Sequence, residues 1–346
     1  MVLKFTRFSP SLVFFSFFMV FGLAFVFTSS GLLGVWVGLE CGFLGVVSLL
    51  AGESAEESEG CMKYFVFQSV GSGVLFFSFV LLGVGANSGV CWGFLLLGFC
   101  LKLGLFPFHY WVPSVMSTCS WFSCFVISVW QKVAPLWVLG GFGFSGVSLV
   151  LVESVVCLTG VIGALGGLGL LHYRCLLGYS SLIHTSWMVL LCLVSAWGCI
   201  LYLFVYGVVL GFLIKNLFSF GIHSMLDFNG FWAPSSSGFF LVFLDFISLG
   251  GVPPFLGSFP KVLTILLCWK VFPFGVAVLI LCSMVSLYYY LSVSIAAAVG
   301  MGINLSFIKE GGLGILEKRS SLFVSTFTGV SFIVGVSLLV ALGFGG

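Results

Sequence analysis

The membrane character of this protein can be read from residues 88–108, SGVCWGFLLLGFCLKLGLFPF, an apolar run whose one charged member is Lys102. A run of about 20 apolar residues is the length that an α-helix needs to cross the hydrocarbon core of a bilayer. A membrane β-strand would instead alternate apolar and polar residues over about ten positions. This stretch therefore predicts a transmembrane helix.

The same composition extends along the whole chain of 346 residues. Hydrophobic residues make up 61% of it and charged residues 6%, and the mean hydropathy is +1.29. A soluble domain carries about 25% charged residues, so most of this surface must face lipid. Because lipid offers the backbone no hydrogen-bond partner, the continuous apolar runs predict an all-α protein that crosses the membrane many times. The net charge of +2 is too small to indicate binding to nucleic acid.

Reading the apolar runs against the polar breaks predicts about eleven transmembrane helices. No stretch between them is long enough for a soluble domain, and the acidic segment 53–59 is expected to be a solvated turn. The expected spans are 8–28, 31–51, 62–84, 88–108, 120–140, 145–170, 175–195, 198–222, 239–269, 272–298 and 320–343.

The lysine and arginine residues of the short loops predict the orientation of the chain. Basic residues accumulate on the side of the membrane where a protein is made. One side of the expected helices holds Lys270 and little else, so the N-terminus should lie on the opposite, synthesis side and the C-terminus should face away. The basic residues on the N-terminal side are Lys4, Arg7, Lys63, Arg174, Lys309, Lys318 and Arg319.

Two segments share a pattern that indicates an internal repeat. LKLGLFPF at 101–108 and SLGGVPPF at 248–255 both place Gly and Pro within a membrane span, where they interrupt its hydrogen bonds. Paired broken helices are typical of transporters built from repeats, with the ion path at the breaks. The breaks fall in the fourth and ninth expected spans, and this odd separation predicts inverted topology. We expect one membrane domain over 1–346, with repeats at about 8–140 and 145–298 and a terminal helix at 320–343.

Several ionisable side chains lie inside the expected spans, although each costs about 2.5–3.5 kcal/mol at the bilayer centre on insertion scales. Desolvation favours the neutral form of a lysine, and a nearby carboxylate favours the charged form, so moving a carboxylate can load or unload a proton. We expect Glu40 and Lys132 to be such a switching pair. The other groups expected to pass protons along a hydrated line at the midplane are Lys102, His184, Lys215 and Lys261.

Structural roles are possible for all of these groups. Glu40 could form an ion pair between helices with Lys102 or Lys132, and Lys261 could cap a helix end next to its break. His184 could hydrogen-bond a neighbouring helix, and Lys215 could extend its amine to the membrane surface. Two acidic residues near the ends of spans, Glu153 and Asp245, are expected to be interfacial.

The sequence contains no motif of a soluble enzyme or of a redox centre. It has no phosphate-binding loop after a strand, no GxSxG and no HExxH. Its twelve cysteines are scattered without a CxxC pair, which is typical of free thiols packed as small hydrophobic groups. No pair of histidines indicates haem, and no cysteine cluster indicates an iron–sulfur centre.

Several longer stretches together resemble one known family. They are WVGLE at 36–40, KYFVFQ at 63–68, LKLGLFPFHYWVP at 101–113, SW at 120–121, WQKVAPL at 130–136, GGL at 166–168, GYSSLIH at 178–184 with Trp187, and GVPPFLGSFPK at 251–261. In this order they resemble NADH–ubiquinone oxidoreductase chain 2, the organelle-encoded antiporter-like subunits of respiratory complex I. The richness in Phe, Gly, Val, Cys and Trp, whose codons are rich in T and G, is consistent with an organelle genome.

The resemblance implies an eleven-helix antiporter-like fold and a role in proton translocation driven by remote NADH-to-quinone electron transfer. The key charges of the family fall on Glu40, Lys102, Lys132 and Lys261, and His184 lies in the matching YSSxxH stretch. The enzyme would be the complex: NADH, FMN, iron–sulfur clusters and ubiquinone would be bound elsewhere, and this chain would hold no cofactor. Its partners would be other membrane-arm and accessory subunits and lipid. It would lie in the mitochondrial inner membrane, with the N-terminus in the matrix and the C-terminus on the intermembrane side.

The chain departs from the family pattern at a few positions. Gly42 replaces the usual asparagine two residues after the glutamate, and Ser114 replaces the acidic residue after Trp-Val-Pro. The Arg-Lys pair before the YSS stretch is reduced to Arg174-Cys175. Two other functions stay open from sequence alone: a cation/proton antiporter that works outside a redox complex, and a structural membrane scaffold whose buried charges are ion pairs.

Overall fold

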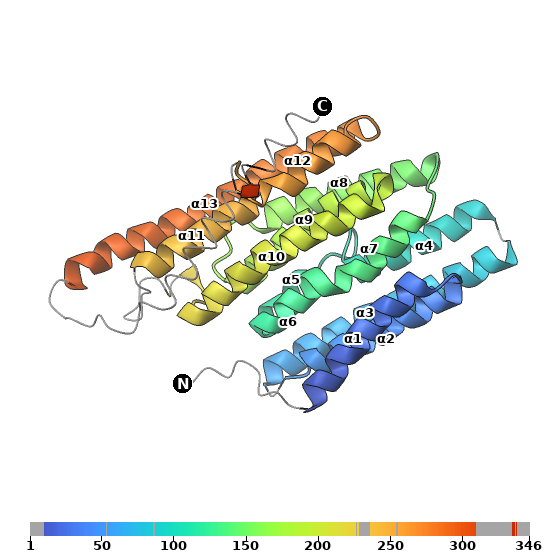
Figure 1. Ribbon diagram of the computed structural model, residues 1–346, viewed down its shortest axis with the longest axis horizontal. Helices are drawn as coiled ribbons and strands as arrows, with labels where there is room; N and C mark the ends of the chain where they lie inside the picture. The colour runs from blue at the N-terminus through green and yellow to red at the C-terminus, as the bar shows by residue number, and fades with distance from the viewer. Residues whose placement is uncertain are drawn as a thin grey trace. The chain divides into compact units, whose positions relative to one another are not determined.

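The computed structural model describes residues 10–52, 54–85, 87–225, 227, 236–253, 255–308, 334, 335 and 337, and all of its regular elements are helical (Figure 1). In this part of the chain the one β-bridge joins His172 and Ser224. The elements are α1 (Pro10–Thr28), α2 (Leu32–Leu50), α3 (Ala55–Val84), α4 (Ser88–Leu103), α5 (Trp111–Thr118), α6 (Trp121–Phe125), the π-helical turn η1 (Val126–Trp130), α7 (Gln131–Gly141), α8 (Val147–Gly166), α9 (Tyr173–Val194), α10 (Ala196–Phe220), α11 (Ser236–Gly250), α12 (Ser258–Cys268) and α13 (Pro273–Ile308).

The all-α prediction is confirmed, and the described part has seven helices long and apolar enough to cross a membrane. Shorter apolar helical segments occur at Val13–Thr28, Gly89–Leu103 and Ser258–Cys268. Each expected span up to 272–298 has a helical counterpart. The last one, 320–343, lies almost entirely outside the described residues, so the number of about eleven stays a prediction.

The expected turn at 53–59 is wrong from Ala55 onward, because α3 already begins there. The hydroxyl of Ser54 accepts a hydrogen bond from the N–H of Glu57, which is a standard helix N-cap. Glu56 and Glu57 lie in the first turn, where negative charge complements the helix dipole. These acidic residues therefore form the first turn of α3 and do not belong to a loop before it.

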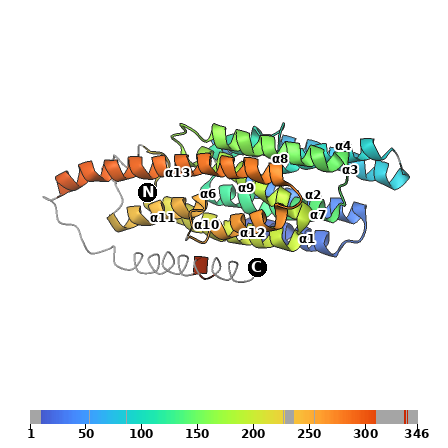
Figure 2. The ribbon, with the colours of Figure 1, turned by 90° about the horizontal axis from the view of Figure 1, so that it is seen from above.

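The chain forms two compact units, Met1–Thr159 and Gly160–Gly346. In the first unit α1 and α2 lie side by side (Figure 1) because glycines let their backbones touch. A Cβ atom on Gly22 would lie 2.5 Å from the backbone nitrogen of Gly42, and one on Gly45 would lie 2.9 Å from the carbonyl oxygen of Phe15. In the second unit α13 runs along α11 (Figure 2), and α9, α10 and α12 pack around one another.

The two expected broken helices are present, one in each unit. In the first unit α4 ends at Leu103, Gly104 has φ +71°, and the chain continues without regular structure to α5. In the second unit α11 ends at Gly250, Gly251 has φ +79°, and α12 starts at Ser258. Glycine is the residue that adopts such left-handed conformations at low cost. Each break therefore starts at a glycine, a few residues before the prolines that also marked it in the sequence.

Hydrogen bonds join the loop before α9 to the loop after α10. The N–H of Tyr173 donates to the carbonyl of His223, and the N–H of Met225 donates to that of Leu171. The carboxylate of Asp227 accepts from the N–H groups of His223 and Ser224 at 2.7 and 2.6 Å. Partial burial raises the pKa of Asp227, but these hydrogen bonds outweigh that effect, and the pKa lies below its ordinary value.

Candidate functional site

The first part of the site is an ion pair at the break of α4. The Nζ atom of Lys102 lies 3.5 Å from Oε1 of Glu40 on α2 and 5.9 Å from the ring centre of Phe43. The Lys102 side chain is 3% exposed and that of Glu40 is 23% exposed. A charge-assisted hydrogen bond would be about 2.7–2.9 Å long, so the pair is loose. Sequence reasoning expected Lys132 as the partner of Glu40, whereas the structure pairs Glu40 with Lys102.

Hydrogen bonds from neighbouring residues hold the backbone around Lys102 and the following break in place. The buried amide of Gln68 on α3 donates to the Lys102 carbonyl at 3.2 Å, and the indole N–H of Trp111 donates to the Leu101 carbonyl at 3.1 Å. Thr159 accepts a hydrogen bond from the N–H of Phe106 inside the break. These bonds satisfy backbone groups that would otherwise be unpaired in a membrane. Gln68 and Trp111 both lie in stretches that carry the family resemblance.

Lys132 lies at a second irregular point of the first unit. Its side chain is buried, with 4% exposed, near the start of α7. The π-helical turn η1 precedes it, and the N–H of Gln131 bonds back to the carbonyl of Val126. Pro135 follows inside α7 and supplies no N–H to the carbonyl of Gln131. Such π-turns are frequent at functional sites. Here η1 precedes the lysine and Pro135 follows it, so the helix is irregular on both sides of Lys132.

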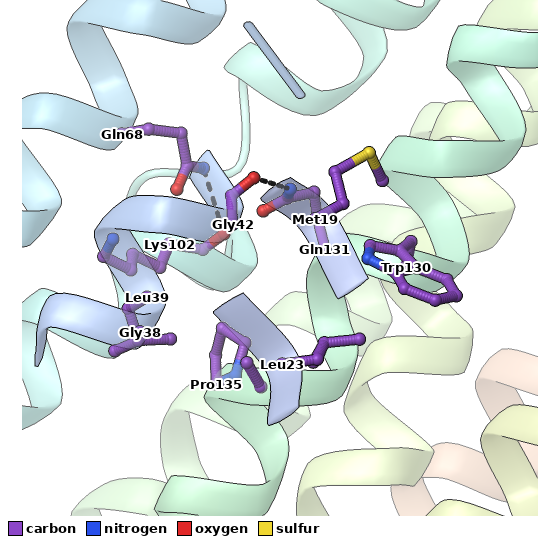
Figure 3. A pocket seen from close by; sticks show the side chains of 11 residues that line it. Met19, Leu23, Gly38, Leu39, Gly42, Gln68, Lys102, Trp130, Gln131 and Pro135 are labelled. Carbon is purple, nitrogen blue, oxygen red and sulfur yellow. Dashed lines mark hydrogen bonds between the residues drawn. The ribbon is translucent and has the colours of Figure 1, made fainter. Parts of the chain in front are cut away.

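A cavity in the first unit is lined by Lys102 and by Gln131, the neighbour of Lys132 in the chain (Figure 3). It holds about 350 Å³ of empty space, part of it open to the outside. In Figure 3, Gln68 and Lys102 lie on one side and Trp130 on the other, with the amide of Gln131 bonded to the Gly42 carbonyl at 3.3 Å. The indole nitrogen of Trp130, which lines this space, is buried without a hydrogen bond in the described structure. A buried polar group beside such a space is normally satisfied by water. The lining residues are Met19, Leu23, Gly38, Leu39, Gly42, Gln68, Lys102, Trp130, Gln131, Ala134 and Pro135.

In the second unit Lys261 bridges the break between α11 and α12. Its side chain is 7% exposed, and its Nζ donates to the carbonyl of Gly250 at 2.6 Å. A Cβ atom on Gly251 would lie 2.9 Å from Nζ and Cδ of this lysine. The alternative that Lys261 caps a helix end is therefore confirmed as a contact. That contact keeps the amine at the break, where the proton-transfer hypothesis needs it.

His184 is the centre of a buried aromatic and hydroxyl cluster. Its Nδ1 lies 3.0 Å from the hydroxyl of Tyr202 on α10, and its ring centre lies 4.5 Å from that of Tyr206. The predicted hydrogen bond to a neighbouring helix is thus confirmed. On α13, Tyr289 and Tyr290 are also buried, with ring centres 4.6 Å apart. Sequence reasoning missed these tyrosines, although the i, i+4 spacing of Tyr202 and Tyr206 already placed both on one face of a helix.

Lys215 does not join the buried charges in this chain. It is exposed on α10, while the next residue, Asn216, is buried. The amide of Asn216 donates to Oδ2 of Asp245 on α11 at 2.5 Å. Asp245, which was expected to be interfacial, is 4% exposed, because α11 turns this side chain toward α10. Nowhere in the described part of the chain do three or more His, Cys, Asp or Glu side chains gather to hold a metal ion.

Comparison with known proteins identifies the family. The sequence model of the NADH:quinone oxidoreductase/Mrp antiporter transmembrane family matches residues 29–287. NADH-ubiquinone oxidoreductase chain 2 of Mytilus edulis is 35% identical over 279 residues, which cover 79% of this chain and 82% of the relative. The same chain of Lumbricus terrestris is 30% identical over 274 residues (78% and 82%), and that of Branchiostoma floridae 31% over 345 residues (94% and 97%). The chain belongs to the NADH:quinone oxidoreductase/Mrp antiporter transmembrane family.

Solved structures support the antiporter-like fold of the family. A chain of respiratory complex I from Thermus thermophilus has a TM-score of 0.77 at 19% identity, with 96% of this chain and 79% of that chain covered. A chain of the Mrp complex from Dietzia has a TM-score of 0.69 at 16% identity, with 81% and 59% covered. At these identities the likeness concerns the fold alone. The antiporter-like membrane fold and the family, both expected from the sequence, are therefore confirmed.

Proposed function

We propose that this chain is a proton-translocating subunit in the membrane arm of NADH:ubiquinone oxidoreductase. Electron transfer from NADH to quinone elsewhere in the complex would drive the protons, and this chain would hold no redox centre. The observation that carries the proposal is the buried lysine at each helix break, Lys102 with the loosely paired Glu40 and Lys261 on the Gly250 carbonyl. Helix breaks with ionisable groups are where transporters bind their ions.

The geometry of the first unit suggests how a proton would move. With Glu40 close, the ammonium form of Lys102 is stabilised, and withdrawal of the carboxylate favours release of the proton. Waters in the cavity lined by Lys102, Gln68 and Gln131 would receive it. Lys132, held between η1 and Pro135, is the next proton-carrying group that we assign, with the buried His184 and Lys261 continuing the path.

The family relationship gives the proposed setting. Its relatives bear the name NADH-ubiquinone oxidoreductase chain 2, so we place this chain in the mitochondrial inner membrane beside other membrane-arm and accessory subunits. The positive-inside pattern assigns the N-terminus to the matrix and the C-terminus to the intermembrane side. NADH, FMN, iron–sulfur clusters and ubiquinone would belong to other subunits.

Replacement of Lys132 by Met tests the proposal. Loss of a positioned proton-transfer group slows the steps that it serves by about 10²–10⁴-fold. In the assembled, reconstituted complex, Lys132→Met should therefore lower the number of protons moved per electron. Lys63→Met is the matched control, because that lysine is 41% exposed and forms a surface ion pair with Glu59. A normal proton-to-electron ratio in a fully assembled Lys132→Met complex would overturn the pumping role and favour a scaffold.

A cation/proton antiporter that works outside a redox complex is the second candidate. The similarity in fold to a chain of the Mrp complex favours it. Buried lysines beside helix breaks would serve both functions. Transport in reconstituted vesicles distinguishes them, since an antiporter would couple proton movement to a sodium gradient without NADH.

A further inference from the structure

Asp245 is a buried acidic residue outside the set of charges that sequence and family assign. It lies on α11, a little more than one helical turn before the break at Gly250. Its side chain is 4% exposed, and its partner Asn216 is 3% exposed. The 2.5 Å distance between Nδ2 of Asn216 and Oδ2 of Asp245 is short for a hydrogen bond to a carboxyl group.

In the described part of the chain, no positively charged side chain forms an ion pair with Asp245. α11 packs against α10, α12 and α13. Among the described residues no lysine, arginine or histidine lies within ion-pair distance of the Asp245 carboxyl. Lys215 on α10 is exposed, and Lys261 on α12 bonds the Gly250 carbonyl. The other titratable groups on these helices are Tyr202, Tyr206, Tyr288, Tyr289 and Tyr290, together with Cys199, Cys268 and Cys282.

This surrounding suits an acid that carries a proton. A buried carboxylate whose partner is a neutral amide has no compensating charge, which costs several kcal/mol in a low-dielectric interior. The protonated acid avoids this cost and still accepts the Asn216 hydrogen bond. Asparagine or serine could serve the same packing role without this risk. An ionisable group in such a place is a functional residue by default in membrane proteins.

We propose that Asp245 is a proton-binding residue of the second unit. Asn216 positions it, and it exchanges its proton with Lys261 at the break between α11 and α12. The inference rests on the proposed function, of which it adds a residue. In the exchange the O–H bond of the acid breaks and an N–H bond forms on the neutral amine of Lys261, through intervening water. The products are the carboxylate and the ammonium ion, and no electrons are transferred. Lys261 then releases its extra proton to water at the break and becomes the neutral amine again, and a proton that reaches Asp245 from the His184 side restores the acid.

The decisive variant is Asp245→Asn in the intact membrane complex. It keeps the size of the side chain and a hydrogen bond to Asn216 but removes the proton-binding group. We expect full assembly, loss of protons moved per electron and loss of one protonated-carboxyl band from the turnover-induced infrared difference spectrum. Asp245→Glu should restore proton movement and shift that band. A structural role alone would leave the band and the proton ratio unchanged in Asp245→Asn, and that result would overturn the inference.

Two comparisons keep the test conclusive. Should Asp245→Asn fail to assemble, Asp245→Glu decides the matter, because an infrared spectrum that does not shift in this variant also overturns the inference. Lys132→Met, measured in parallel, separates the two proposals. A normal ratio in Asp245→Asn with a lowered ratio in Lys132→Met removes Asp245 from the path and leaves the proposed function standing. A normal ratio in Lys132→Met removes the proposed function itself.

Discussion

At the scale of single residues, the loose contact between Glu40 and Lys102 is the feature that a proton switch requires. A tight, fully bonded pair would hold both charges permanently, whereas a 3.5 Å separation leaves one oxygen of Glu40 without a hydrogen bond in the described structure. The cavity lined by Lys102, Gln68 and Gln131 gives water a place beside the lysine. Small movements of Glu40 would then change the preference of Lys102 for its proton.

Glu40→Gln should impair both proton movement and stability. Removal of one partner of a buried ion pair costs about 3–5 kcal/mol. Because the Glu40 side chain is 23% exposed, we expect a smaller loss of about 1–3 kcal/mol, typical of a hydrogen bond to a charged group. Thermal unfolding of the solubilised complex and its proton-to-electron ratio measure the two effects. Glu59→Gln is the control, since Glu59 pairs with Lys63 at the surface, where ion pairs contribute little to stability. Equal behaviour of the two variants would contradict a special role for Glu40.

Sequence patterns predicted which residues lie in the membrane better than which of them meet. Lys102, Lys132 and Lys261 are buried as expected, because an apolar run around a lysine already shows the cost of its position. The partner of Glu40 was assigned wrongly, since composition does not determine which helices are neighbours. Asp245 was judged by its distance from a span end, although the direction of its side chain on α11 decides its burial. The π-turn before Lys132 is a shift in hydrogen bonding that leaves no sign in composition.

At the scale of elements, each unit has one broken helix, and the two breaks are built in the same way. Both breaks begin at a glycine with positive φ, and a buried lysine lies beside each. The Gly and Pro residues of 101–108 and 248–255 predicted both breaks, because neither residue type supports a continuous helix. The inverted symmetry of the two halves stays a prediction.

Gly251→Ala should impair proton transfer at the break between α11 and α12. The left-handed backbone costs a residue with a Cβ atom about 1–2 kcal/mol. The new methyl group would also lie 2.9 Å from the amine and Cδ of Lys261 and would push this side chain from the Gly250 carbonyl. We expect lower thermal stability together with a lower proton-to-electron ratio.

Gly85→Ala is the matched control for that variant. Gly85 has φ +72°, and a Cβ atom there would meet nothing within 4 Å. It should therefore carry the backbone cost alone, with a similar loss of stability and a normal proton ratio. Loss of proton movement in Gly85→Ala as large as in Gly251→Ala would show that the effect is backbone strain and not displacement of Lys261.

At the scale of the whole molecule, the proposed function assigns proton transfer to this chain and electron transfer from NADH to quinone to other subunits. Large apolar side chains such as Trp197 and Phe204 are 76% and 70% exposed, a surface that fits lipid or other membrane subunits. The chain should therefore be found in a larger assembly.

Native gel electrophoresis of mildly solubilised mitochondrial membranes tests this requirement. We expect the chain to co-migrate with a very large species that stains for NADH dehydrogenase activity, because its proposed driving reaction occurs in other subunits of that species. The activity stain is the internal control for intact complexes. Recovery of the chain in a small species without activity, while the large band persists without it, would contradict membership of the complex. Sodium-coupled proton movement by that small species in vesicles would then identify the chain as an independent antiporter that shares the fold.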